Sequence, residues 1–186
     1  MRDSYSKSVG HFDPPTWVAS PQYTVKSRSY GLLWAGLLIN SRPMIQLQNV
    51  RPDEQQALIT LLQKVQLLTD DLPADLSDFV IAKEHDTLIG VAGLERFGSV
   101  GLLRSVAVDP PYRGQHIAAQ LIGRLLETAE AAGLREVYLI TTTADRYFER
   151  HGFQPVNRQD VPTTIQQTQQ FSDLCPSTAV VMKRLL

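Results

Sequence analysis

The sequence contains a single cysteine, Cys175, in 186 residues. One cysteine excludes a disulfide within the chain and any metal site built from several thiolates. So few thiols fit a reducing compartment, and we expect a cytoplasmic protein. No grouping of His, Asp and Glu along the sequence is typical of metal ligands either, so we expect no metal site.

The chain also lacks an excess of charge of one sign. Lys and Arg number 18, Asp and Glu number 19, and the formal net charge is -1. There is no run of Lys or Arg that would create a local basic field. Nucleic-acid binding depends on such a field, and we therefore expect no nucleic-acid partner.

Long hydrophobic runs are missing as well. The most apolar run, residues 31–39, is far shorter than the roughly 20 residues needed to cross a bilayer, so we expect no membrane association. Residues 1–43 mix Ser, Tyr, Pro and Gly without periodicity and are expected to form a loosely ordered N-terminal extension. The apolar run in them suits a short docking helix, a partner contact, or translation from a start upstream of the natural one at Met44.

From Met44 to Leu186 the pattern is that of one domain. After a helix cap at residues 51–53, apolar spacing over residues 58–68 predicts a helix of about four turns, followed by an acidic loop over 69–78 that could border a substrate. Further helices are expected at 117–132, 144–151 and 161–170, and strands at 45–50, 79–83, 88–94, 100–108, 137–140, 153–156 and 179–186. This order predicts an α/β (α+β mixed) fold, a mixed sheet with helices on both faces.

The run RGQHIA, Arg113 to Ala118, lies between a predicted strand and a predicted helix. The first N–H groups of a helix have no partner inside it and sit at the positive end of its dipole. Arg113 adds a full charge, and Gly114 allows a turn that a Cβ would obstruct. The run thus suits a diphosphate cradle for a nucleotide-type cofactor, although it also suits an ordinary loop, since it matches neither common phosphate-binding glycine motif.

Two longer stretches extend this pattern: VAVDPPYRGQHIA at Val106 to Ala118 and ADRYFERHGF at Ala144 to Phe153. They resemble the acetyl-CoA pyrophosphate motif and the A-x-x-F-Y-x-x-x-G-F signature of the GCN5-related N-acetyltransferase (GNAT) superfamily. The stretches LLRSVAV, LITTTADRYFERHGF and FSDLCPSTAVVMKRL look like the arsenic-resistance N-acetyltransferase subfamily, which in turn resembles the acetyltransferase domain of N-acetylglutamate synthase. The resemblance covers residues 44–186 and implies the GNAT fold, with a mostly antiparallel sheet of six to seven strands and a splayed strand pair.

The resemblance implies that acetyl-CoA lies where the strands at 100–108 and 137–140 part. Its pantetheine would pair with main-chain groups near Val106 and Val108, its diphosphate with N–H groups from Arg113 to Ala118, and its thioester carbonyl with an N–H near Val106, which would act as the catalytic oxyanion donor. The implied cofactor-binding residues are Val106, Ala107, Val108, Arg113, Gly114, Gln115, His116, Ile117, Ala118, Phe148 and Arg150.

Two positions depart from the family's pattern. His116 stands where the family usually has glycine, and its side chain could weaken CoA binding or bring a pH-dependent charge. Phe148 stands where the family usually has a proton-donating tyrosine, so we expect Phe148 to pack against the cofactor. Tyr147 precedes it and is expected to face elsewhere on the helix. The thiolate would then be protonated by water or another residue.

Arg104 lies among apolar residues in a strand expected to be covered on both faces, where an unpaired charge is costly. It could bind a substrate carboxylate, or pair with Glu95 or Asp109. The subfamily that the chain resembles has an Arg at this point. This favours substrate binding by Arg104, with Ser105 as a secondary contact.

Glu95 is a candidate base for deprotonating the ammonium of an acceptor, and a surface position near a turn is the alternative. Thr142, at the end of a strand, is a candidate substrate contact. Thr143 is expected to cap the helix that starts at Ala144.

These features predict an N-acetyltransferase that moves an acetyl group from acetyl-CoA to the amine of a small-molecule substrate, an amino acid or an analogue, by direct attack. Two other functions stay open: a protein or peptide N-terminal acetyltransferase, and a catalytically weak acyl-CoA-binding module. A homodimer is also open.

Overall fold

The computed structural model describes residues 44–174 and 176–186. The predicted N-terminal extension, residues 1–43, and the single cysteine, Cys175, lie outside the described residues. A bilayer-spanning helix, which needs both length and apolar composition, is not found in the described ranges.

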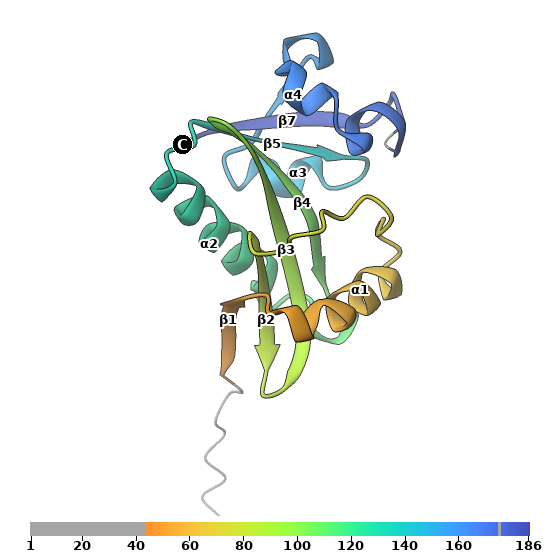
Figure 1. The fold of residues 1–186 in the computed structure, drawn as a ribbon, viewed down its shortest axis with the longest axis vertical. Helices are drawn as coiled ribbons and strands as arrows, with labels where there is room; N and C mark the ends of the chain where they lie inside the picture. Colours follow the sequence, from red (N-terminus) through yellow and green to blue (C-terminus); the bar gives the residue numbers. More distant parts are fainter. Residues whose placement is uncertain (1–43, 175) are drawn as a thin grey trace, which may run out of the picture. The chain divides into compact units, whose positions relative to one another are not determined.

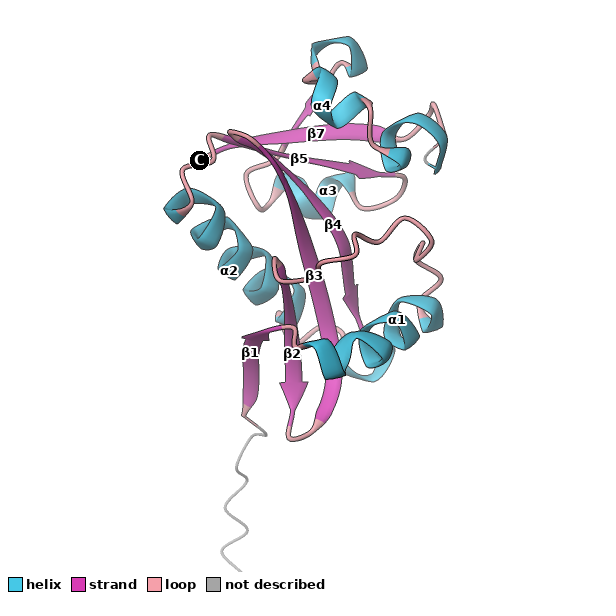
Figure 2. Cartoon of the chain, in the orientation of Figure 1, coloured by secondary structure: helices cyan, strands magenta, loops and turns pink. Residues whose placement is uncertain are grey.

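The described residues form one seven-stranded sheet (Figures 1 and 2). Its strands are β1 (Ile45–Asn49), β2 (Phe79–Glu84), β3 (Thr87–Phe97), β4 (Val100–Val108), β5 (Glu136–Thr141), β6 (Gln154–Val156) and β7 (Val180–Leu185), in the spatial order β1-β2-β3-β4-β5-β7-β6. Among these strands, only β4 and β5 pair in parallel. The expected mixed, mostly antiparallel sheet of six to seven strands is thus confirmed.

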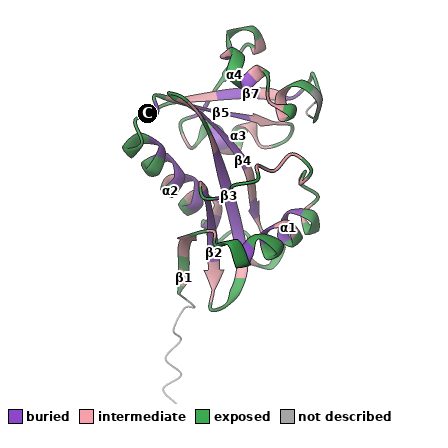
Figure 3. Cartoon of the chain, viewed as in Figure 1, coloured by how far each residue is buried: buried purple, intermediate pink, exposed green. Residues whose placement is uncertain are grey.

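Helices cover both faces of this sheet. They are α1 (Gln55–Lys64), α2 (Ile117–Ala131), α3 (Asp145–Glu149) and α4 (Thr163–Gln166). Along β2, Val80 and Ala82 pack in the cluster that contains the α2 stripe, while Phe79 and Ile81 pack in the cluster under α1. Alternate residues of a strand point to opposite faces, so β2 supplies both cores (Figure 3).

The first helix is shorter than predicted. It ends at Lys64, where the N–H of Leu67 bonds to the carbonyl of Leu62 and the N–H of Gln66 to that of Gln63. This is a Schellman-type helix end, and Gln66 takes its left-handed position with φ 60°. The expected extension to Leu68 is wrong because glutamine fills a position where glycine usually marks the stop.

The predicted helix over residues 161–170 is also wrong in extent. Only Thr163–Gln166 is α-helical, and a π-helical turn follows at Gln170–Leu174. The hydroxyl of Thr168 donates to the carbonyl of Ile165 (2.7 Å) and accepts from the N–H of Phe171 (3.3 Å). These local bonds compete with the helical ladder and explain the break.

Candidate functional site

The two central strands part after a short stretch of pairing. Residues Val100 to Leu102 of β4 pair with Glu136 to Tyr138 of β5, and there the ladder ends. Beyond this point β5 stays paired with β7 and β4 with β3. The edge of β4 that faces β5 therefore carries main-chain groups with no partner strand, as the splayed pair requires.

A β-bulge lies in this open half of β4. Arg104 pairs with Gly93 and Ala107 with Val91, so both Ser105 and Val106 stand opposite Ala92. Ser105 takes the left-handed conformation, with φ 53°. An extra residue of this kind bends the strand, and such bulges are common next to active sites. The bulge thus redirects the main chain at Ser105 and Val106, at the point where the strands part.

The start of α2 lies beside this opening. In the described part of the chain, the N–H groups of residues 114–118 have no hydrogen-bond acceptor. The N–H of Arg113 donates to the carbonyl of Pro110 (3.3 Å), so the predicted series of open donors begins one residue later, at Gly114. The Arg113 side chain is exposed, and its Nε donates to the carbonyl of Val108 (3.2 Å). The geometry is that of an anion cradle.

A cleft of about 1130 Å³ joins the opening to the cradle. None of the described residues that line it is acidic, whereas Arg104, Arg113 and Arg150 all line it. The predicted site residues found in its wall are Arg104, Ser105, Val106, Ala107, Val108, Arg113, Gly114, His116, Ile117, Ala118, Thr142, Phe148 and Arg150. Gln115 is exposed outside the cleft, and Glu95 lines a smaller neighbouring cavity.

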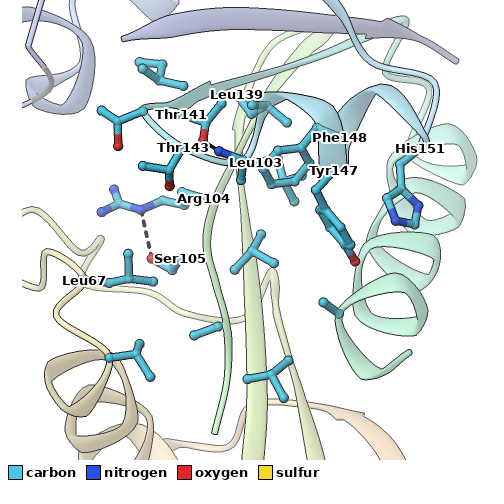
Figure 4. Close-up of a pocket in the computed structure, with 18 of the residues that line it drawn as sticks. Leu67, Leu103, Arg104, Ser105, Leu139, Thr141, Thr143, Tyr147, Phe148 and His151 are labelled. Atoms are coloured by element: carbon cyan, nitrogen blue, oxygen red, sulfur yellow. Dashed lines mark hydrogen bonds between the residues drawn. The ribbon is translucent and has the colours of Figure 1, made fainter. Parts of the chain in front are cut away.

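Both aromatic residues of α3 line the cleft (Figure 4). Phe148 is buried and packs edge-on against Phe153, with ring centroids 5.9 Å apart. Tyr147, expected to face elsewhere, also lines the cleft, because a one-turn helix at its rim exposes two adjacent positions. Arg150 lies 5.7 Å from the Tyr147 ring centroid and is exposed.

Burial sets the protonation of one group on α3 and of one just after it. Burial raises the pKa of the Tyr147 hydroxyl, although the nearby Arg150 charge opposes the shift. Burial also lowers the pKa of His151, and the charges of Arg150 and Arg184 lower it further. At neutral pH Tyr147 is therefore a protonated hydroxyl, able to donate, and His151 is a neutral imidazole.

Arg104 is bound by two carboxylates rather than free. Its Nη2 lies 2.6 Å from Asp71 Oδ1, its Nη1 bonds to Glu95 Oε1, and the same Nη1 donates to the Asp71 carbonyl (2.9 Å). The Arg104 side chain is 4% exposed and that of Asp71 is 3% exposed. Of the pairings predicted for Arg104, the one with Glu95 is observed, whereas Asp109 is bound by Lys64 (2.7 Å).

The threonines at the end of β5 have other roles than those predicted. The hydroxyl of Thr141, not of Thr143, accepts the N–H of Ala144 (3.0 Å) and so supports the start of α3. Thr142 and Thr143 are exposed and line the cleft. Thr142 thus remains a candidate substrate contact.

Sequence reasoning missed three kinds of site residue. Asp71 lies in the acidic loop that was expected to border a substrate, but Asp70 beside it looks equivalent in the sequence. Leu68 follows the helical spacing and Leu67 precedes it, yet both line the cleft as exposed side chains. Gln170 lines both cavities, and no sequence signal distinguishes it from its glutamine neighbours. In the described ranges, no three His, Cys, Asp or Glu side chains gather as metal ligands.

The comparison with protein families decides the classification. The model described as "Acetyltransferase (GNAT) family" matches residues 44–153, more than half of the chain. The chain belongs to the GNAT acetyltransferase family. The predicted resemblance to this family is therefore confirmed, and both motifs that suggested it lie in the matched range.

Relatives of this GNAT protein include amino-acid acetyltransferases. That of Escherichia coli (strain K12) is 29% identical over 123 residues, which make up 65% of this chain and 27% of the relative. The chain thus spans about a quarter of the length of the curated relatives that it matches.

Solved structures show the same fold. N-acetylglutamate synthase from Neisseria gonorrhoeae, complexed with coenzyme A and N-acetyl-glutamate, superposes with a TM-score of 0.67 at 18% identity over 77% of this chain and 35% of that one. Rv2747 from Mycobacterium tuberculosis, in a complex that contains CoA, gives a TM-score of 0.63 at 21% identity over 76% of this chain and 99% of that one. The predicted GNAT fold is confirmed.

The glycine that the GNAT pattern has at position 116 now has a structural reason. His116 precedes α2 with φ 60° and ψ 17°, a left-handed conformation that costs a residue with a Cβ about 1 to 2 kcal/mol. Glycine adopts it freely but loses about 0.5 to 1 kcal/mol more chain entropy on folding.

We expect His116→Gly to stabilise the fold by about 0.5 kcal/mol, as strain is relieved, and to tighten acetyl-CoA binding about threefold by opening the cradle. Urea unfolding and calorimetry measure the two effects. His85→Gly is the matched control, because His85 is also exposed with positive φ (53°) but lies in the β2–β3 turn. His85→Gly should give the stability gain without a change in acetyl-CoA affinity. Equal acetyl-CoA affinity in the wild type and in His116→Gly would contradict a role for position 116 in CoA binding.

Proposed function

We propose that the protein is an acetyl-CoA-dependent N-acetyltransferase acting on the amine of a small molecule. The observation behind this proposal is that two features lie in the same cleft. The open edge of β4 begins where its pairing with β5 stops, and the unbonded N–H groups of residues 114 and 116–118 lie in the same wall. One feature suits an extended pantetheine chain and the other a diphosphate.

The cleft offers acetyl-CoA a complementary charge distribution. The N–H groups after Arg113 would hold the diphosphate, and the guanidinium groups of Arg113 and Arg150 would meet phosphate charges at the rim. Main-chain groups of Val106, Ala107 and Val108 would pair with the pantetheine amides. Phe148 would pack against the thioester arm.

The chemistry follows from positioning. The N–H at the Ser105–Val106 bulge would donate a hydrogen bond to the thioester carbonyl oxygen, where negative charge develops, a contribution of about 3 kcal/mol in comparable sites. A neutral amine held beside it forms a C–N bond to the carbonyl carbon while the C–S bond breaks. The amine loses a proton to water, which can relay it to the free oxygen of Glu95 in the neighbouring cavity, and the Tyr147 hydroxyl, which lines the cleft and is protonated at neutral pH, returns one to the thiolate.

The relatives support an amino acid or an analogue as the acceptor. The E. coli relative is an amino-acid acetyltransferase, and the Neisseria neighbour was solved with N-acetyl-glutamate. Arg104 and Ser105, together with Thr142, are the proposed acceptor-side residues, with Arg104 acting through its pair with Glu95. A carboxylate that bound Arg104 directly would have to displace a resident carboxylate.

Further attributes belong to the same proposal. We place the catalytic domain at residues 44–186 and the protein in the cytoplasm, where one cysteine suits the redox state. The resemblance to arsenic-resistance N-acetyltransferases supports an arsenic-related acceptor in the amino-acid class. No nucleic acid, membrane or metal is proposed as a partner, and a homodimer stays an open proposal.

Two assays test this function. Calorimetry with acetyl-CoA should show one site per chain, and thiol release should rise above the hydrolysis background with at least one amine in a panel of amino acids, diamines and short N-terminal peptides. Release with peptides alone would favour N-terminal acetylation. Tight acetyl-CoA binding without release for any amine would instead identify a binding module, and no binding at all would contradict the proposal.

A further inference from the structure

A second cavity adjoins the cleft on the far side of Arg104. It has a volume of about 400 Å³, and it shares Arg104 and Gln170 with the wall of the cleft. We call it the acidic pocket, and its polar wall includes Asp71, Glu95, Arg104, Thr164, Gln167 and Gln170. The two cavities therefore meet at Arg104 and Gln170.

Every nitrogen of the Arg104 guanidinium, which lies in this wall, has a partner. Nη1 serves Glu95 Oε1 and the Asp71 carbonyl, Nη2 faces Asp71 Oδ1 at 2.6 Å, and Nε contacts Ser105 Oγ at 3.4 Å (Figure 4). Each nitrogen of Arg104 already has a partner, so a ligand carboxylate would compete with these groups for the guanidinium. Arg104 thus holds its neighbours in place instead of presenting a free cation.

Some hydrogen-bond acceptors in the wall of the acidic pocket have no donor. Oδ2 of Asp71 and the side-chain oxygen of Gln170 are buried without a hydrogen-bond partner, whereas Oδ1 of Asp71 faces Arg104 Nη2. Two carboxylates against one guanidinium also leave a formal charge of -1 in this wall. Buried acceptors without donors are costly, so the wall is complementary to a group that brings several N–H donors and a positive charge.

We propose that the acidic pocket binds the ammonium end of an acceptor that carries two amino groups. This rests on the proposed function and narrows its substrate class: one amine reaches the thioester in the cleft, and the other is held by Asp71, Glu95 and the Gln170 oxygen. Short diamines and basic amino acids fit this description. Acidic amino acids do not, because their side-chain carboxylate would meet two resident carboxylates.

Matched acceptor pairs test the proposal. Thiol release is measured for 1,4-diaminobutane against 1-aminobutane, and for L-lysine against L-norleucine, with L-glutamate added. We expect kcat/KM to be at least about tenfold higher for the diamino member of each pair, since a hydrogen bond to a charged group contributes about 1.5 to 3 kcal/mol. Equal values within each pair, or a preference for glutamate, would overturn the proposal.

A variant pair assigns the preference to this pocket. Asp71→Asn should bring the ratio of the two kcat/KM values close to one, and acetyl-CoA affinity within error of the wild type shows that the variant is folded. Asp70→Asn is the matched control, because Asp70 is the adjacent aspartate but is exposed and lines neither cavity. An unchanged ratio in Asp71→Asn, or a lost preference in Asp70→Asn, would contradict the assignment.

A binding measurement separates this proposal from the proposed function. Calorimetry of 1,4-diaminobutane with the CoA-saturated protein needs no turnover, and binding should weaken at least about tenfold in Asp71→Asn and about threefold in Gln170→Leu, which leaves the ion pairs untouched. If thiol release fails for every amine but this binding persists, the function fails and the pocket stands. If diamine binding is undetectable in the wild type, the pocket proposal fails whatever the turnover.

Discussion

Replacing Arg104 with methionine is expected to lower the free energy of unfolding by about 3 to 5 kcal/mol, the usual cost of removing one partner from a buried ion pair. The substitution leaves Asp71, whose side chain is 3% exposed, and Glu95, at 21%, without their shared cation. It also removes the bond that ties the loop after α1 to β4 through the Asp71 carbonyl. Urea unfolding measures the loss, and adding Asp71→Asn to the variant should recover part of it.

The control for this experiment is Arg96→Met. Arg96 pairs with Asp78 at 2.7 Å, but its side chain is 48% exposed. Exposed pairs contribute about 1 kcal/mol or less, so this variant should cost no more than that. If Arg104→Met were as mild as Arg96→Met, the cluster could not be the buried anchor that the acidic pocket requires.

Replacing Gly114 with aspartate is expected to weaken acetyl-CoA binding about 100-fold. The new carboxylate would lie among the open N–H groups of the cradle, next to the diphosphate. Two like charges about 6 Å apart repel by about 3 kcal/mol at the effective dielectric constant of a protein surface, and this energy corresponds to that factor. Calorimetric titration with acetyl-CoA measures it directly.

Gly98→Asp separates this electrostatic effect from backbone strain. Both glycines have positive φ, 80° at Gly114 and 65° at Gly98, and neither has an atom within 4 Å of an added Cβ. The two substitutions therefore strain the backbone alike, but Gly98 lies in the β3–β4 turn, away from the cleft. Gly98→Asp should leave acetyl-CoA affinity unchanged within about twofold, and similar losses in the two variants would contradict the diphosphate cradle.

The sequence predicted most of what local pattern can determine. The apolar stripe of α2, from Ile117 to Ala129, is buried as expected, and Gly133 ends that helix with φ 78°. Strand β4 has its predicted bounds, and the cradle follows it as the motif required. Failures occurred where short-range bonds outweighed spacing, as at Gln66 and Thr168.

Tertiary structure alone decided the acceptor side of the site. Which of Asp70 and Asp71 is buried depends on how a loop crosses the sheet, and the occupation of Arg104 depends on residues 33 and 9 positions away in the chain. Periodicity and motifs report on neighbours along a helix, strand or turn, so the sequence by itself determined the fold class, the family and the anion cradle before α2. The charge and the open hydrogen-bond acceptors of the acidic pocket come from segments that meet only in the folded chain, because burial and pairing between distant residues leave no periodic signal.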